Sequence, residues 1–212
     1  MSANDINGLQ TLTLAVTGAS GSILAFKMLQ VLAGDARVGR IHLVVSPSAL
    51  RVLAEETGTS GRNSFIEKAL GSELAAEAKA KFVQHAHEDV GAPIASGSYP
   101  CNAMIVLPCS MGTLAGIAHG LAANLVERAA DVCLKERRRL VMCVRETPLN
   151  LIHIRNMAAV TEAGGTIFPV IPTFYNQPQT TDDMARNFVD RVLQHVGLPQ
   201  SGAFVWGADA KG

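Results

Sequence analysis

The chain has 212 residues, of which 48% are hydrophobic and 17% charged, and its formal net charge at pH 7 is zero. A balanced charge argues against a nucleic-acid or membrane-surface partner, because both select proteins with a basic excess. The length suits one domain with its own core, and the small charged fraction favours a homo-oligomer whose subunits cover part of the surface.

Short apolar runs alternate with helical patterns along the whole chain. Strands are predicted at 12–16, 41–45, 103–107, 140–144 and 166–170, with a less regular one at 82–84. Helices are predicted at 23–32, 49–56, 65–79, 114–119, 124–138, 148–162 and 181–196. This alternation is typical of an α/β, Rossmann-like (flavodoxin-like) three-layer sandwich, with helices on both faces of a mostly parallel sheet. We interpret 1–212 as one domain with tails at 1–10 and 197–212, the second covering either the site or a subunit contact.

The sequence indicates a protein of the cytoplasm. Residues 1–10 are polar and do not form a signal peptide, and no apolar run is long enough to span a bilayer. The cysteines have no zinc-ligand spacing, and we expect them to be free, buried thiols. His85 and His87 share a predicted strand face, but two imidazoles without a third ligand do not predict a metal site.

The first strand runs into the turn Thr17–Gly21. Gly18 and Gly21 allow a tight turn, and Ser20 is suited to cap the helix that follows. The N-terminus of such a helix favours an anion, most often a phosphate. Helix capping alone explains the same residues without a ligand.

Polar residues also follow three other strands, at Ser46, at Ser110–Thr113 and at the pair Arg145-Glu146. Because ligands of parallel sheets bind at the carboxyl ends of the strands, these turns predict a cradle for a phosphorylated ligand. Nicotinamide dinucleotides are disfavoured, since no acidic residue ends the second strand and neither tyrosine has a lysine four residues on.

Long motifs throughout the chain resemble the UbiX/Pad1 family of flavin prenyltransferases. The resemblance rests on Thr17–Gly21, Pro93–Ser98, Asn102–Met104, Pro108–Thr113, Glu127–Arg137, Arg145–Pro148 and Phe174–Pro178. It implies a homododecameric flavoprotein that binds FMN and needs no metal. Such an enzyme joins the dimethylallyl group of dimethylallyl monophosphate to N5 and C6 of reduced FMN. The product, prenylated FMN, serves a UbiD-type decarboxylase.

The resemblance also implies roles for individual residues. Those that match FMN contacts are Gly18, Ala19, Ser20, Ser46, Ser110, Met111, Gly112, Thr113 and Arg145. Those that match the site of the prenyl phosphate are Arg128, Lys135, Tyr175, Arg191 and Trp206. The residues with implied catalytic roles are Ser20, Glu56, Lys135 and Glu146.

These residue types suit the implied chemistry. Breaking an allylic C–O bond releases phosphate, which cations such as Arg128, Lys135 and Arg191 stabilise. Closing the ring at C6 requires loss of a proton, for which the carboxylate of Glu146 is our choice, while Ser20 orients a proton near N5. Without the resemblance, Arg128 and Lys135 would be interpreted as part of a solvated ladder with Asp131.

Two alternatives remain at this point. Flavin-dependent peptidyl-cysteine decarboxylases share the fold, but their Pro-Ala-Ser-Ala-Asn-Thr motif differs from Pro93–Ser98. A non-catalytic FMN-binding accessory subunit of a decarboxylase is the other, although storage alone would not require cations for a phosphate beside the flavin.

Overall fold

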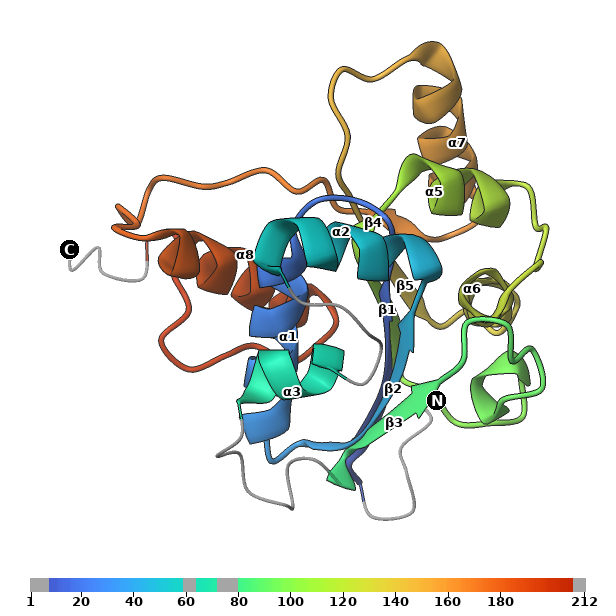
Figure 1. Cartoon of the computed structure of the whole chain (residues 1–212), viewed down its shortest axis with the longest axis horizontal. Coiled ribbons are helices and arrows are strands. Elements are labelled where there is room, and N and C mark those ends of the chain that lie inside the picture. The colour runs from blue at the N-terminus through green and yellow to red at the C-terminus, as the bar shows by residue number, and fades with distance from the viewer. Residues whose placement is uncertain (1–7, 59–63, 72–79, 208–212) are drawn as a thin grey trace.

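The computed structural model describes residues 8–58, 64–71 and 80–207. Within these ranges the chain forms a six-stranded, fully parallel sheet with the strand order β3-β2-β1-β4-β5-β6 (Figure 1). The strands are β1 (Gln10–Val16), β2 (Val38–Val45), β3 (Phe82–His85), β4 (Ala103–Cys109), β5 (Arg139–Val144) and β6 (Thr166–Ile167). The predicted α/β sandwich is confirmed, and the less regular strand at 82–84 is β3.

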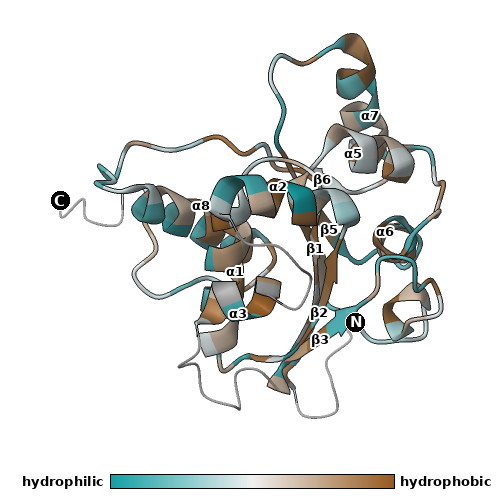
Figure 2. Ribbon diagram, viewed as in Figure 1, coloured by the Kyte–Doolittle hydropathy of each residue, from teal (hydrophilic) through white to brown (hydrophobic). Residues whose placement is uncertain are grey.

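Helices cover both faces of the sheet (Figure 1). One layer contains α1 (Ser22–Gly34), α2 (Pro47–Thr57), α3 (Ser64–Leu70) and α8 (Thr181–His195), whose apolar side chains pack on the Leu12 and Leu14 face. The other contains η1 (Pro93–Ala95), α5 (Met111–Ala118), α6 (Leu125–Lys135) and α7 (Leu151–Glu162), which pack on the Ala15 and Val44 face. The central strands are apolar on both faces, as Figure 2 shows, because helices bury each face.

Several predicted boundaries were wrong. Helix α7 begins at Leu151 and not at Pro148, because Asn150 and His153 form a capping box that satisfies two backbone donors. Strand β6 ends at Ile167, short of the expected 170. Helix α3 ends at Leu70, and 72–79 of the helix expected at 65–79 lies outside the described residues.

The four cysteines, Cys101, Cys109, Cys133 and Cys143, are buried and free, as expected. No three His, Cys, Asp or Glu side chains in the described ranges gather into a group that could hold a metal ion. Among the described helices, none is long and apolar enough to cross a membrane.

A buried carboxylate clamps the start of the C-terminal tail to the turn between α1 and β2. Asp35 accepts hydrogen bonds from Nε (2.9 Å) and an Nη (2.6 Å) of Arg37, and from the amide nitrogen of Gln200 (3.0 Å). Arg37 also donates to the carbonyl of Pro199 at 3.1 Å. The hydrogen bonds from Arg37 hold the pKa of Asp35 well below its usual range. The clamp therefore fixes where the tail leaves the body of the protein.

We predict that Asp35→Asn destabilises the protein by about 1–3 kcal/mol, because it removes the buried ionised acceptor to which Arg37 and Gln200 donate. A lower midpoint in thermal unfolding, followed by circular dichroism, checks this. Asp182→Asn is the control, since Asp182 pairs with Lys27 but its side chain is 63% exposed, and its effect should stay within about 0.5 kcal/mol. Equal midpoints for Asp35→Asn and the wild type would contradict the clamp.

Candidate active site

The carboxyl ends of β1, β2, β4 and β5 are joined by hydrogen bonds into one rim. Thr17, after β1, donates its hydroxyl to the carbonyl of Pro108 (2.9 Å), and that hydroxyl accepts from the amide of Ser110 (2.8 Å). The amides of Ser46 and Arg145 bond to the last residues of β1 and β4, at 3.0 and 3.1 Å. Strand order reverses between β1 and β4, which is where ligands of such sheets bind. The structure thus brings together the four turns that the sequence analysis singled out.

Gly18 is required on this rim by the close approach of α2. A Cβ at Gly18 would overlap the Cβ of Ser48 in the first turn of that helix. Ala19, beside it, is 9% exposed. The glycine therefore allows α2 to pack against the β1 turn, which carries Ser20 on its outer side.

The carboxylate of Glu56 binds the start of α1. It accepts from the hydroxyl of Ser20 (2.6 Å), the amide of Gly21 (2.8 Å) and the amide of Ser22 (2.8 Å). Burial acts to raise the pKa of Glu56, but the hydrogen bonds from Ser20 and Ser22 outweigh it and the net pKa is lowered. The carboxylate is therefore ionised at neutral pH, and it matches the positive end of the helix dipole.

This contact corrects two expectations. Ser20 does not cap α1: the N-cap is Gly21, and Ser20 donates its hydroxyl to Glu56. The anion at this helix start is a carboxylate of the chain itself and not the phosphate that the turn predicted. The sequence analysis named both residues but could not pair them, because they lie 36 positions apart on different elements.

The other two hydroxyl turns are helix caps, as expected from the simpler interpretation. Ser46 accepts from the amide of Ala49 at 3.1 Å, and Ser110 accepts from the amide of Thr113 at 3.3 Å. The hydroxyl of Ser110 also donates to that of Thr113 at 3.1 Å. At the same helix start, Met111 is 9% exposed, whereas Gly112 is exposed with open space where a Cβ would lie. The N-terminus of α5 is therefore accessible from the rim.

At the end of β5, Arg145 and Glu146 are both exposed. The carboxylate of Glu146 accepts from the amide of Thr147 at 3.0 Å. Both side chains thus stand at the same edge of the sheet as Ser20 and Ser110.

The cations of α6 lie elsewhere. Arg128 pairs with Asp131 (2.6 Å) and donates to the carbonyl of Ala95 (3.0 Å), while Lys135 pairs with Glu136 (2.5 Å). Because α6 ends just before β5 begins, Lys135 lies toward the amino end of that strand, whereas Arg145 follows its carboxyl end. The predicted ladder with Asp131 forms only at Arg128.

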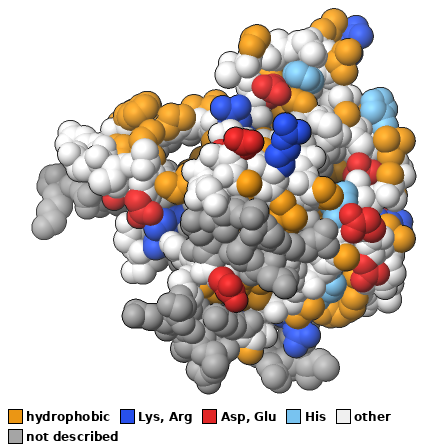
Figure 3. Space-filling model, viewed as in Figure 1, with side chains coloured by type: hydrophobic (Ala, Val, Ile, Leu, Met, Phe, Trp, Pro, Cys, Tyr) orange, Lys and Arg blue, Asp and Glu red, His pale blue; other side chains and the backbone are white. Residues whose placement is uncertain are grey.

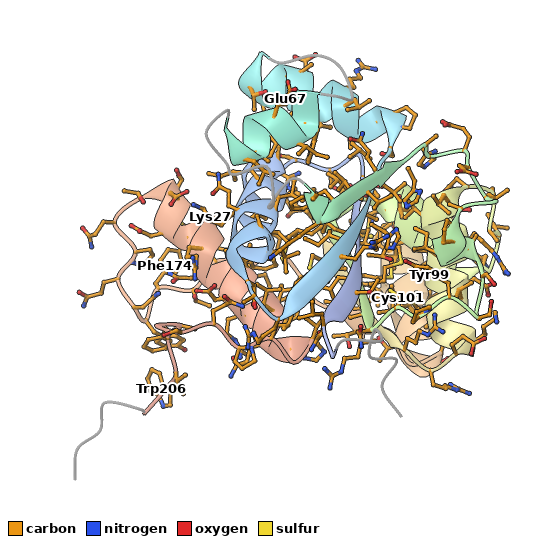
Figure 4. All side chains as sticks on the ribbon, turned by 90° about the horizontal axis from the view of Figure 1, so that it is seen from below. Lys27, Glu67, Tyr99, Cys101, Phe174 and Trp206 are labelled. Carbon is orange, nitrogen blue, oxygen red and sulfur yellow. The ribbon has the colours of Figure 1, made fainter. Side chains whose placement is uncertain are left out.

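The remaining donor residues line a cavity of about 300 Å³ beside α8. Tyr175 and Trp206 meet edge-on with ring centroids 4.9 Å apart, and the guanidinium of Arg191 donates to the side chain of Gln194. Both rings are largely exposed, at 71% and 76%. Figure 4 shows Phe174 and Trp206 on the α8 side of the molecule, far from Tyr99 on the α6 side. One chain therefore holds the predicted donor residues as two groups on opposite faces of the sheet.

Comparisons with known proteins identify the family of the chain. A family model described as Flavoprotein matches residues 2–193. The flavin prenyltransferase UbiX of Salmonella typhimurium is 44% identical over 191 residues, covering 90% of this chain and 94% of that protein. The chain belongs to the UbiX family of flavin prenyltransferases.

Solved structures of UbiX proteins share the fold. A dodecameric FMN-dependent UbiX-like decarboxylase from Escherichia coli O157:H7 superimposes with a TM-score of 0.81 at 40% identity, covering 93% of this chain and 99% of that one. AnUbiX (PadA1), solved in complex with FMN and dimethylallyl pyrophosphate, gives a TM-score of 0.81 at 38% identity, covering 93% and 97%. The predicted family and fold are thus confirmed.

We predict that Gly18→Ala lowers both the thermal midpoint and the amount of FMN retained on purification, because α2 must move away from the rim. Ser48→Gly removes the overlapped atom and should restore much of both properties in the double variant. Ser48→Gly alone serves as the baseline, since glycine in a helix costs about 1 kcal/mol by itself. Unchanged flavin retention in Gly18→Ala would show that the UbiX rim does not need this contact.

Proposed function

We propose that the chain transfers the dimethylallyl group of a dimethylallyl phosphate to N5 and C6 of reduced FMN, and that a UbiD-type decarboxylase uses the product. The observation that carries this proposal is the Ser20–Glu56 pair on the rim of a chain 39–44% identical to flavin prenyltransferases named UbiX. Four unbridged buried thiols support a reducing compartment, the cytoplasm.

The rim fits FMN in one orientation better than in others. Since Glu56 already binds the start of α1, the flavin phosphate is better accommodated at α5, where Ser110 and Thr113 carry hydroxyls and Gly112 leaves open space. Arg145 follows the neighbouring strand and supplies a positive charge to the same region. Reduced FMN, when bound, supplies the nucleophilic N5 and C6 atoms.

Three polar side chains of the rim suit the proton transfers. Ser20 donates to Glu56, so its remaining lone pairs are available to accept a hydrogen bond from a flavin N–H. The ionised Glu56 keeps that hydroxyl oriented. Glu146 is exposed at the end of β5 and can accept the proton lost from C6.

The donor phosphate needs cations that one chain does not bring together. Arg128 and Lys135 lie in the α6 layer, and Arg191 lies in the α8 layer with Tyr175 and Trp206. We propose that α6 of one copy completes the donor site of another within a homododecamer.

Exposed apolar side chains support contacts between copies. Leu151, Ile152 and Ile154 of α7 are 51–65% exposed, as are Ile171 and Phe174 after β6, at 64% and 66%. Figure 3 shows hydrophobic side chains gathered over both regions. Two such patches at separate places on one chain suit a ring of copies better than a lone monomer.

The test is an anaerobic incubation of the protein with reduced FMN and dimethylallyl monophosphate, followed by mass spectrometry of the released flavin. A flavin heavier by one prenyl unit is expected. Unmodified FMN, with the diphosphate also tried, would overturn the proposal in favour of an accessory subunit that only binds the flavin.

We predict that two inactive variants complement each other. Lys135→Ala and Arg191→Ala should each lose most prenyl transfer and still bind FMN. When the two are co-expressed, roughly a quarter of the sites in mixed assemblies receive both native residues, because each residue comes from a different copy. Co-expression of Lys135→Ala with the wild type at known ratios calibrates the yield. Absence of recovered activity when Lys135→Ala and Arg191→Ala are co-expressed would contradict a site shared between copies.

A further inference from the structure

Away from the rim, two histidines and a tyrosine form a hydrogen-bonded chain. His42 on β2 is 2% exposed. Its Nδ1 lies 2.8 Å from Nε2 of His85 on β3, and its Nε2 lies 2.9 Å from the hydroxyl of Tyr99. The imidazole rings are stacked with centroids 5.0 Å apart, and Tyr99 meets His42 edge-on. Three residues distant in sequence thus form one partly buried polar unit around the buried His42.

This chain anchors the segment Ser96–Tyr99, here called the donor loop, against α6. Arg138 holds the loop backbone by donating to the carbonyls of Gly97 (2.5 Å) and Tyr99 (2.9 Å). Gly97 lies so close to Lys135 that a Cβ there would collide with the ammonium group. Figure 4 shows Tyr99 on this side of the sheet, next to Cys101. The position of the donor loop therefore defines the surroundings of Lys135.

The hydrogen-bonded chain of His42, His85 and Tyr99 can accept one added proton without breaking, but not two. In the neutral chain either Tyr99 donates to His42 and His42 donates to His85, or both bonds run in the opposite direction. One added proton is accommodated, because the His42 tautomer can reverse. A second added proton makes both imidazoles positively charged and places two N–H groups face to face, so the hydrogen bond between His42 and His85 breaks.

The groups around the two imidazole rings shift the histidine pKa values in different directions. Burial, together with the neighbouring His85 and Arg40, lowers the pKa of His42 to about 4. Burial also lowers the pKa of His85, while Asp89 opposes this. Histidines of the unfolded protein bind protons near pH 6.5, whereas His42 and His85 of the folded protein bind them only at lower pH. The free energy of unfolding is therefore unaffected by these two groups above about pH 6.5, and it decreases as the pH falls toward 4.

We propose that His42 and His85 are positioning residues that fix the donor loop through Tyr99, so that protonation of this chain in acid releases the loop and weakens binding of the prenyl phosphate. The inference rests on the proposed function for the identity of the donor. The hydrogen-bonded chain itself is defined by contacts within one subunit.

The first test uses the unmodified protein. Hydrogen–deuterium exchange at the histidine ring carbon, followed by mass spectrometry across pH 4–8, measures the pKa of each histidine separately. His42 should exchange slowly and titrate well below the ordinary histidine value of about 6.5, and His85 should also titrate below that value. Both histidines titrating at the ordinary value would overturn the proposal.

The second test measures the KM for dimethylallyl monophosphate between pH 4 and 7.5. In the wild type we expect the KM to rise about threefold to tenfold at the acid end. His85→Gln places an amide near the position of Nε2 without titrating, and should flatten that rise. Tyr99→Phe should raise the KM at every pH with kcat within about twofold, because the anchor is lost and the chemistry is untouched. His119→Gln is the control and should follow the wild type.

The outcomes separate this inference from the proposed function. Absence of prenylated flavin at every pH would overturn the proposed function, while the histidine exchange would still test the hydrogen-bonded chain. Prenylated flavin formed with the same acid-side rise in KM in His85→Gln and the wild type would overturn the inference alone.

Discussion

The rim of the sheet depends on one carboxylate at the start of α1. Glu56 satisfies two backbone amides and one hydroxyl there, and its negative charge lies at the positive end of the helix. Without it, the turn after β1 would present an anion site to solvent. With Glu56 in place, that helix start already holds an anion, whereas the start of α5 on the same rim has open space at Gly112. A single side chain thus holds α2 to the start of α1 and supplies the negative charge at that helix end.

The cations of α6 and α8 lie on opposite faces of the sheet because the two helices belong to different layers. In a parallel sheet, successive helices must cover one face or the other, and residues on α6 and α8 are separated by the strands between them. Cations on both helices can act on one phosphate only when separate copies meet. The exposed apolar side chains of α7 and of the segment after β6 provide surface for a contact between copies.

Local patterns were enough to predict the layers and the caps at Ser46 and Ser110, but not the caps of α1 and α7. The apolar runs of β1 and β4 identify buried parallel strands, and Ser46 and Ser110 cap helices three residues ahead, within reach of sequence spacing. The contacts that define the site are not local. Glu56 meets Ser20 across 36 positions, and His42 meets Tyr99 across 57. Nothing in either segment indicates the other, because the sheet order alone brings them together.

The clamp at Asp35 also sets the reach of the tail. Trp206 follows Gln200 by only six residues, so a fully extended segment carries the indole no farther than about 20 Å from the clamp. The indole is therefore a tethered group, confined to a small volume around a fixed point. Its local concentration near Tyr175 is on the order of millimolar or higher, whatever the concentration of the protein in solution. The contact of the indole with Tyr175 at the cavity therefore costs little translational entropy, because the clamp fixes one end of the segment.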